Sequence, residues 1–500
     1  MDHLDYTGHP FVDVGLATLT AYARRRHPRE LTQDDLQAAA DYMARSYIVN
    51  PLKSFLSVAF TSNAWFNQDA YNPDKPGLSP EEKEKRRQKR ELWQKRHLYQ
   101  WNQPLNAQAV EIDIYTGRPV VVEPLSQRLR PGRGARAQIP LTIGDEYINF
   151  LPYGDPGTPI SGITLLALYM MPLGCAKVAG KLLAVHSDDP DLILHFARTF
   201  LTTNLQNVQA AQAAGEKKLP ETSPRRARTL LIEHLMGAMQ EQKRKQGAEE
   251  PPATLTAYHF TNSGQGADLT IYPLPLEVAN FLAVATSPGY RDAWTALVDR
   301  GWQITQAKRG REAPPPTYNR LYEDLFDLPE QAAAFIRRYF LRRPGRGWGK
   351  GDPTQTYHTR QEAALISWRL TQLFLEKVVL MDELRIQHIR ELGDDLARYI
   401  VAQNDRRFFR HFYMARHYGQ VRAALIKASQ AQVKRGQPPL VTLERFLAVF
   451  EQVEGVPHAD WRLGRDLVLI RMFEQLFHQG WLQEHAAELP EDEENDVEHE

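Results

Sequence analysis

A chain of 500 residues with 42% hydrophobic and 24% charged side chains has room for several folded domains, and its composition excludes a fibrous or wholly disordered protein. The 61 basic and 61 acidic residues balance, but residues 488–500 hold eight acids and no Lys or Arg, so the remainder carries about +8. The most apolar stretch, residues 162–185, is interrupted by proline and lysine, which excludes an unbroken membrane span. Residues 1–10 show no signal-peptide pattern and Cys175 is the single cysteine, so we expect a cytoplasmic protein without internal disulfides.

The first seventy residues predict helices. Apolar residues recur at steps of three and four over residues 13–27 and 32–48. Thr32 is a natural N-cap, since Asp34 and Asp35 follow it in the first helical turn. The Asn50-Pro51 pair is expected to end the second helix.

Residues 73–101 predict an exposed basic arm. Its charged run at 81–97 has eight basic and four acidic side chains and little apolar face, which indicates a helix in solvent. Lys85, Arg86, Lys89 and Arg90 are candidate contacts to DNA phosphates, because Lys and Arg supply most contacts to a nucleic-acid backbone. The alternative is an ordinary solvated helix.

Alternating apolar and polar residues predict short strands at 110–115, 119–122 and 137–150 and within 254–274, with helices between 188 and 245. A Gly-, Pro- and Arg-rich segment at 342–353 is typical of a linker, and amphipathic helices follow from 361 to 485. We therefore expect an α+β fold. It comprises an N-terminal α+β region of residues 1–350 with small β-sheet elements, an all-α helical bundle of residues 351–487 and an acidic disordered tail at 488–500.

Basic residues gather in three runs that contain no acid: residues 128–136, 337–350 and 406–435, with four, six and eight Lys or Arg. Such clustering is typical of a protein that binds a polyanion. Taken singly, each run is also compatible with a solvated surface. Together the three runs favour nucleic acid as a partner.

The sequence contains no recognisable catalytic motif. Residues 345–351 lack the glycine spacing and the Ser or Thr of a phosphate-binding loop, and no HExxH pair or His-Cys cluster is present. The pairs Asp188-Asp189 and Asp394-Asp395 fit helix caps and solvated faces, although spacing alone leaves a two-metal nuclease open. We expect no catalytic residue, no metal and no cofactor.

Five strings resemble the large subunit of the type I-B CRISPR Cascade, a crRNA-guided surveillance complex. They are spread over the first two thirds of the chain: TGHPFVDVGLATL (7–19), ELTQDDL (30–36), NPLKSFLSVAFTSNAWFNQ (50–68), YHFTNSGQGADLTIYPLP (258–275) and YNRLYEDLF (318–326). Some members of that family carry a cysteine-rich zinc module. This chain has Cys175 alone and departs from that pattern, with the basic arm in its place.

The resemblance implies a non-catalytic subunit that recognises the protospacer-adjacent motif in double-stranded DNA, helps to open the duplex for crRNA pairing and holds the displaced single strand. It also implies partners: crRNA, the target DNA, the backbone, 5′-handle-binding and small subunits, and a recruited helicase-nuclease. No membrane is expected. In such subunits the N-terminal domain binds the crRNA 5′ end and the motif duplex, and the helical bundle supports the displaced strand.

Candidate DNA-binding residues of the N-terminal region lie in and before one loop. Lys53 is a phosphate candidate, and amides and hydroxyls interleaved with an aromatic ring suit base-edge contacts and a wedge at a base step. The loop candidates are Thr61, Ser62, Asn63, Trp65, Asn67 and Gln68. The alternative is a structural turn with Trp65 and Phe66 anchored in the core.

Candidate residues elsewhere follow the same chemistry. For the displaced strand they are Arg406, Arg407, Arg410, Arg416, Arg422 and Lys427, with Phe409, Tyr413 and Tyr418 available for stacking. For crRNA they are Asn262, Gly264, Gln265 and Gly266, either as a nest of backbone amides around a phosphate or as a plain hairpin turn. Two other classes of function remain open: a metal-dependent nucleic-acid enzyme and a purely protein-binding scaffold.

Overall fold

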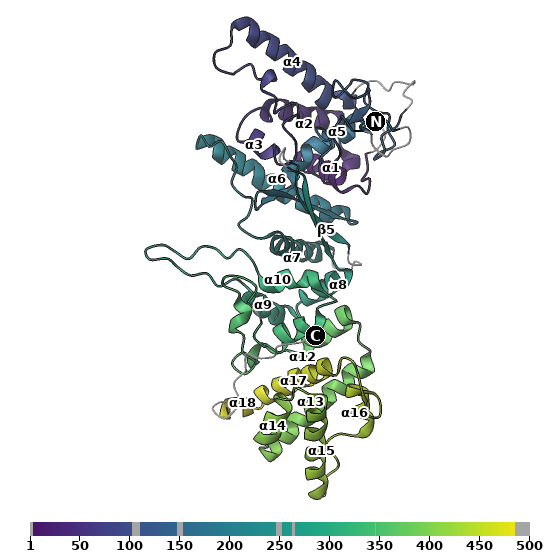
Figure 1. The fold of residues 1–500 in the computed structure, drawn as a ribbon, viewed down its shortest axis with the longest axis vertical. Helices are drawn as coiled ribbons and strands as arrows, with labels where there is room; N and C mark the ends of the chain where they lie inside the picture. The colour runs from purple at the N-terminus through teal and green to yellow at the C-terminus, as the bar shows by residue number, and fades with distance from the viewer. Residues whose placement is uncertain are drawn as a thin grey trace. The chain divides into compact units, whose positions relative to one another are not determined.

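The computed structural model describes residues 4–102, 111–147, 154–246, 253–262, 266–345 and 347–485. The chain forms two compact units, one of residues 1–248 with 253–274 and one of residues 275–500 with 249–252. A four-stranded sheet belongs to the first unit, and the second is largely helical (Figure 1). This confirms the predicted α+β fold. The predicted acidic tail at 488–500 lies outside the described residues.

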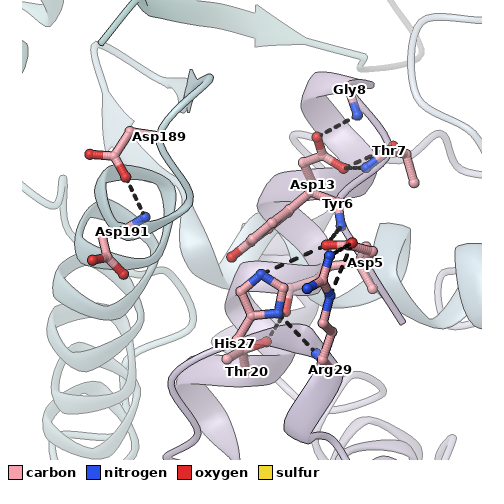
Figure 2. Close-up of polar contacts among 11 residues, drawn as sticks. Asp5, Tyr6, Thr7, Gly8, Asp13, Thr20, His27, Arg29, Asp189 and Asp191 are labelled. Atoms are coloured by element: carbon pink, nitrogen blue, oxygen red, sulfur yellow. Dashed lines mark hydrogen bonds and ion pairs between the residues drawn. The ribbon is translucent and has the colours of Figure 1, made fainter. Parts of the chain in front are cut away.

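Helix α1 (Pro10–Tyr22) lies at the centre of the first unit, and all of its residues from Phe11 to Ala21 are buried. Asp13, 1% exposed, accepts hydrogen bonds from the backbone N–H groups of Thr7 at 2.7 Å and Gly8 at 2.9 Å, which fixes the chain before the helix (Figure 2). A Cβ on Gly15 would lie 2.1 Å from the carbonyl oxygen of Ala167 in α5 (Gly162–Met170). The two helices therefore touch through their backbones.

The sheet of the first unit is antiparallel, in the order β3-β4-β5-β6. Its strands are β3 (Ala176–Val178), β4 (Lys181–Ser187), β5 (Leu255–Thr261) and β6 (Asp268–Leu274). Helices α1 and α6 (Pro190–Ala213) pack against β4, whose Leu182 to Val185 are buried. The strand prediction for 254–274 is thereby confirmed.

The first unit also contains further helices and two short strands. They are α2 (Gln33–Ser46), α3 (Leu52–Leu56), α4 (Pro80–Leu98), α7 (Ala227–Gln246), β1 (Arg133–Gly134) and β2 (Thr158–Pro159). Thr32 caps α2 as predicted, in a capping box with Asp35. The strands predicted at 110–115, 119–122 and 137–150 are wrong over the described residues; the first two are reduced to an isolated bridge between Ile112 and Pro119. Turns held by side chains replaced the ladder there, as when Asp113 accepts from Tyr115 N–H at 2.7 Å.

The second unit is built from helices around an aromatic core. They are α8 (Leu276–Ala285), α9 (Arg291–Arg300), α10 (Arg320–Asp324), α11 (Ala332–Phe335), α12 (Trp368–Phe374), α13 (Glu383–Gln403), α14 (Arg406–Tyr413), α15 (Tyr418–Lys434), α16 (Leu443–Phe450), α17 (Trp461–His478) and α18 (Trp481–Glu484). A hairpin of β7 (Glu451–Val453) and β8 (Val456–Pro457) follows α16. The Phe374 ring stacks on Phe335 at 5.1 Å and meets Phe281 edge-on at 5.4 Å.

The segment at 342–353, predicted to be a linker at a domain boundary, is anchored in the second unit at both ends, while residues 347–350 are exposed. Arg342 is fully buried, with its guanidinium carbon 3.6 Å from the centre of the Tyr357 ring and its Nη2 2.7 Å from Glu362. Asp352 is 2% exposed and caps the following turn at Thr354. The compact units divide at 274/275 instead of 350/351, because residues 275–350 share their core with the helices that follow.

Candidate nucleic-acid interface

The loop after α3 is closed by its own polar side chains. Asn67 Nδ2 donates a 3.0 Å hydrogen bond to the carbonyl of Thr61, and Ser57 Oγ donates to Asn67 Oδ1 at 3.1 Å. Gln68 Nε2 donates to the carbonyl of Asn63 at 3.0 Å. The side chain of Asn63 itself is exposed and forms no hydrogen bond with any described residue. Asn67 therefore has a structural task in this loop, whereas the amide of Asn63 is open to solvent.

Trp65 and Phe66 are each 3% exposed and anchor the loop in the core. The Phe66 ring meets Tyr47 edge-on at 5.9 Å, and the Trp65 ring meets Tyr169 at 6.5 Å. This is the arrangement that the alternative interpretation expected. Trp65 is not placed to insert into a base step.

A cleft of about 720 Å³ opens beside this loop. Its lining includes five residues of the loop: Thr61, Ser62, Asn63, Trp65 and Gln68. Its other described lining residues are Tyr71, Trp93, His97, Leu125, Ser126, Gln127, Arg128, Ala135, Arg136, Ala137, Gln138, Gly144, Asp145, Glu146 and Tyr147. The cleft thus joins most of the predicted loop to part of the basic run at 128–136, a proximity that nothing in the local sequence indicates.

The buried side chain of Asn262 holds Arg136, one of the residues that line the cleft. It is fully buried, its Oδ1 accepts a 2.8 Å hydrogen bond from Arg136 Nε, and its Nδ2 donates to the carbonyl of Ala59 at 3.0 Å. Asn262 is therefore not placed to contact an RNA phosphate, and it positions Arg136 instead. Gly264 and Gln265 lie outside the described residues, and Gly266 is exposed.

Helix α4 forms the predicted arm. Ser79 and Glu82 form a capping box at its start, and its last turn is held by buried His97 and by Gln94, whose Nε2 donates to the carbonyl of Ala44 at 2.7 Å. Burial lowers the pKa of His97 to about 4, so its imidazole is neutral at physiological pH. Residues 81–85 and 87–89 are exposed, so the arm enters solvent as predicted.

The four predicted phosphate contacts of the arm differ in role. Lys85 and Lys89 are exposed and have no ion pair with any described residue. Arg86 Nη1 donates to the carbonyl of Asp69 at 2.8 Å and so holds the preceding loop. Arg90 lines a small hollow of about 30 Å³ together with Lys53.

In the second unit, α14 is strongly amphipathic. Its buried face is Phe408, Phe409, Phe412 and Tyr413, and its arginines are exposed. Arg407 and Arg410 on α14, and Lys427 and Lys434 on α15, are exposed and make no ion pair with any residue that the structure describes. Arg422 Nε lies 3.8 Å from Glu451. Arg406 and Arg416 are exposed and have contacts of their own. Positive charge is thus presented on both helices.

Two of the three aromatic side chains predicted to stack with bases are not available there. Phe409 is fully buried and Tyr413 is 1% exposed, because both belong to the core beneath α14. The hydroxyl of Tyr418 donates a hydrogen bond to Glu451. Burial is the largest cause that raises the pKa of Tyr418, and the Glu451 carboxylate raises it further. This surface therefore offers charge to a strand's phosphates, and of the three predicted stacking residues only the half-buried Tyr418 is partly accessible.

Three of the six basic residues in the run at 337–350 are paired with carboxylates. Arg337 Nε pairs with Asp466 at 3.0 Å, Arg338 pairs with Asp324, and Arg342 pairs with Glu362. The run at 128–136 is similar, since Arg130 pairs with Asp155 at 3.0 Å and Arg133 with Glu111. Of the three acid-free runs, the one at 406–435 keeps the most unpaired charge among the described residues.

Among the residues that the structure describes, no group of three or more His, Cys, Asp or Glu side chains is placed to hold a metal ion. Cys175 is fully buried, and burial raises the pKa of its thiol. None of the helices in the described ranges has the length and apolar character needed to span a bilayer.

Comparison with known proteins finds no family model that matches the chain and no significantly similar curated protein.

Proposed function

We propose that this protein is a non-catalytic nucleic-acid-binding subunit, and specifically the large subunit of a type I-B CRISPR Cascade in the cytoplasm. In this role it recognises the adjacent motif in double-stranded DNA, helps crRNA to pair and holds the displaced strand. The particular subunit rests on the five strings at 7–19, 30–36, 50–68, 258–275 and 318–326. Nucleic-acid binding rests on an independent structural observation.

That observation is the surface of α14 and α15. Arg407, Arg410, Lys427 and Lys434 are exposed and make no ion pair with any residue in the described ranges, although other clustered arginines of the chain are matched by carboxylates. Unmatched charge raises the energy of the folded protein unless counterions or a polyanion neutralise it. The phosphate backbone of a nucleic acid neutralises such cations, and the counterions released from it favour binding.

The test uses the full-length chain and a fluorescent 30-nucleotide single strand over a range of salt concentrations. We expect log K to fall linearly with log salt, with a slope of about −3 if the four cations each meet one phosphate. Binding that is absent even at 20 mM salt contradicts the proposal and favours a protein-binding scaffold. The same strand incubated with Mg²⁺ or Mn²⁺ is expected to stay intact, and steady cleavage favours the nucleic-acid enzyme.

The particular subunit is tested by reconstitution. The chain is expected to join a crRNA-loaded type I-B backbone and to confer selection of duplexes that carry one adjacent motif. If the chain binds single strands but never enters the complex, the proposed nucleic-acid binding stands and the Cascade assignment fails.

A further inference from the structure

The acidic tail of residues 488–500 has the opposite charge to the surface of α14 and α15. The tail holds eight Asp or Glu and no Lys or Arg, so its carboxylates have no Lys or Arg partner within the tail itself. On the surface, Arg407, Arg410, Lys427 and Lys434 are exposed and make no ion pair with any described residue. Opposite charges attract one another, most strongly at low ionic strength. The tail and the surface are therefore complementary.

The acidic tail follows a segment that packs against α14. His485, the last described residue, stacks on Trp481 of α18 with 4.6 Å between the ring centres. The Trp481 ring lies 5.4 Å from the ring of Phe409 in α14, and α18 lies beside α14 in Figure 1. Its Nε1 also donates a 3.2 Å hydrogen bond to Asn404, just before α14 begins. The tail is thus tethered next to the helix that carries two of the four cations.

The tether has a suitable length. The fifteen residues from 486 to 500 span at most about 50 Å when extended, and α15, with its 17 residues, is about 26 Å long. The tail can therefore reach the cations of both helices. A short flexible tether also gives a local concentration on the order of millimolar, so that weak individual ion pairs suffice for binding.

We propose that the acidic tail binds the surface of α14 and α15, with its carboxylates paired to Arg407, Arg410, Lys427 and Lys434, and that a nucleic-acid strand displaces it. The displacement rests on the proposed function, because it requires a strand that binds this surface. The tail then weakens the binding of every strand at low salt. The effect disappears at high salt, which screens the ion pairs of the tail.

Coupling with a water-soluble carbodiimide tests the contact, because this reagent joins a carboxylate to a lysine amine only when the two touch. We expect amide bonds from the tail of the full chain to Lys427 or Lys434 at 20 mM salt, identified by mass spectrometry, and their loss at 500 mM salt. The controls are Lys308 and Lys377, which are exposed in the same unit but outside α14 and α15. Absence of coupling to α15, or equal coupling to the control lysines, overturns the proposal.

A matched pair of variants separates binding of the tail from a change of net charge. The tail variant carries Glu491→Gln, Asp492→Asn, Glu493→Gln and Glu494→Gln. The control variant neutralises four exposed acids of the second unit that make no ion pair with any described residue: Glu312→Gln, Glu330→Gln, Glu383→Gln and Glu444→Gln. Both variants change the net charge equally.

The readout is the affinity for a fluorescent 30-nucleotide single strand. At 50 mM salt the tail variant should bind at least threefold more tightly than the control variant, and at 500 mM salt the two should bind alike. Equal affinities at 50 mM salt would show that only net charge matters and would overturn the displacement of the tail by a strand.

The outcome is separable from that of the proposed function. If strands bind the full chain while the tail couples to neither lysine of α15, the inference fails and the proposed function stands. If the tail couples to Lys427 or Lys434 while neither the wild type nor the tail variant binds a strand at 20 mM salt, the proposed function fails. Binding of the tail to α14 and α15 then stands by itself.

Discussion

Arg337 Nε lies 3.0 Å from a carboxylate oxygen of Asp466, a residue 129 positions further along the chain. Asp466 is 4% exposed and also accepts hydrogen bonds from Arg465. Arg337 lies in a basic run whose composition suggested nucleic-acid binding, but the structure shows it as an ion-pair partner of a buried carboxylate. The relationship yields a prediction on stability and one on pH.

Asp466→Asn is expected to destabilise the protein by about 3–5 kcal/mol, because it leaves Arg465 and Arg337 partly or wholly buried without their carboxylate. Urea unfolding followed by circular dichroism measures the change. The affinity of the folded variant for a single strand should match that of the wild type. A lowered affinity in the folded variant would contradict the structural role assigned to this pair.

Stability is also expected to fall in acid through Asp466. Burial acts to raise the pKa of this carboxyl, but Arg465, Arg337 and Arg343 outweigh it and hold the pKa below its ordinary value. A lowered folded-state pKa contributes stability that is fully present above the unfolded value of about 4 and is lost as the pH falls through the folded value. Unfolding measured from pH 6 to pH 3 should show a steeper loss for the wild type than for Asp466→Asn.

Reversing Arg407 and Arg410 to Glu should weaken single-strand binding and flatten the salt slope by about 1.4, since each phosphate contact contributes about 0.7. Neither side chain pairs with a described residue, so the melting temperature should stay nearly constant. Arg390→Glu/Arg462→Glu is the matched control, because both arginines are exposed in the same unit but outside α14 and α15. An equal effect of the control pair would show that only net charge matters.

Lys85→Glu/Lys89→Glu on α4 should lower the affinity of the assembled complex for all duplex sequences alike, with a salt slope flatter by about 1.8. Arg86 is left in place, because its guanidinium holds the loop at Asp69. An unchanged slope in filter-binding measurements would mean that the arm is only a solvated helix.

Asn63→Ala and Asn67→Ala should separate binding from folding. Asn67→Ala removes the hydrogen bonds to Thr61 and Ser57 and is expected to cost about 1–2 kcal/mol of stability. Asn63→Ala should leave stability unchanged and weaken binding of the assembled complex to motif-bearing duplex by about 1–3 kcal/mol, with little effect on an already opened target. Thermal melts and competition binding measure the two effects, and equal binding losses on both targets would make the loop purely structural.

Much of the fold is predictable because its signals are local. The capping box at Thr32, the charged helix of the arm and the strand alternation of 254–274 each arise within a few residues, where hydrogen-bonding geometry and side-chain periodicity act directly. The predicted strands at 137–150 failed where described, because strand-like alternation does not reveal that turn hydrogen bonds will satisfy the backbone.

For this protein the sequence by itself determined the α+β class, the capped helices and which charges the chain possesses. Tertiary structure decided which of those charges remain available: Arg342 is buried against Tyr357 and Glu362, whereas Arg407 is exposed. It also placed Asn262 against Arg136 and fixed Trp65 in the core beside a cleft. The reason is physical, since charge pairing and burial depend on distance in space, and the partners lie from 20 positions apart, as for Arg342 and Glu362, to 126, as for Arg136 and Asn262.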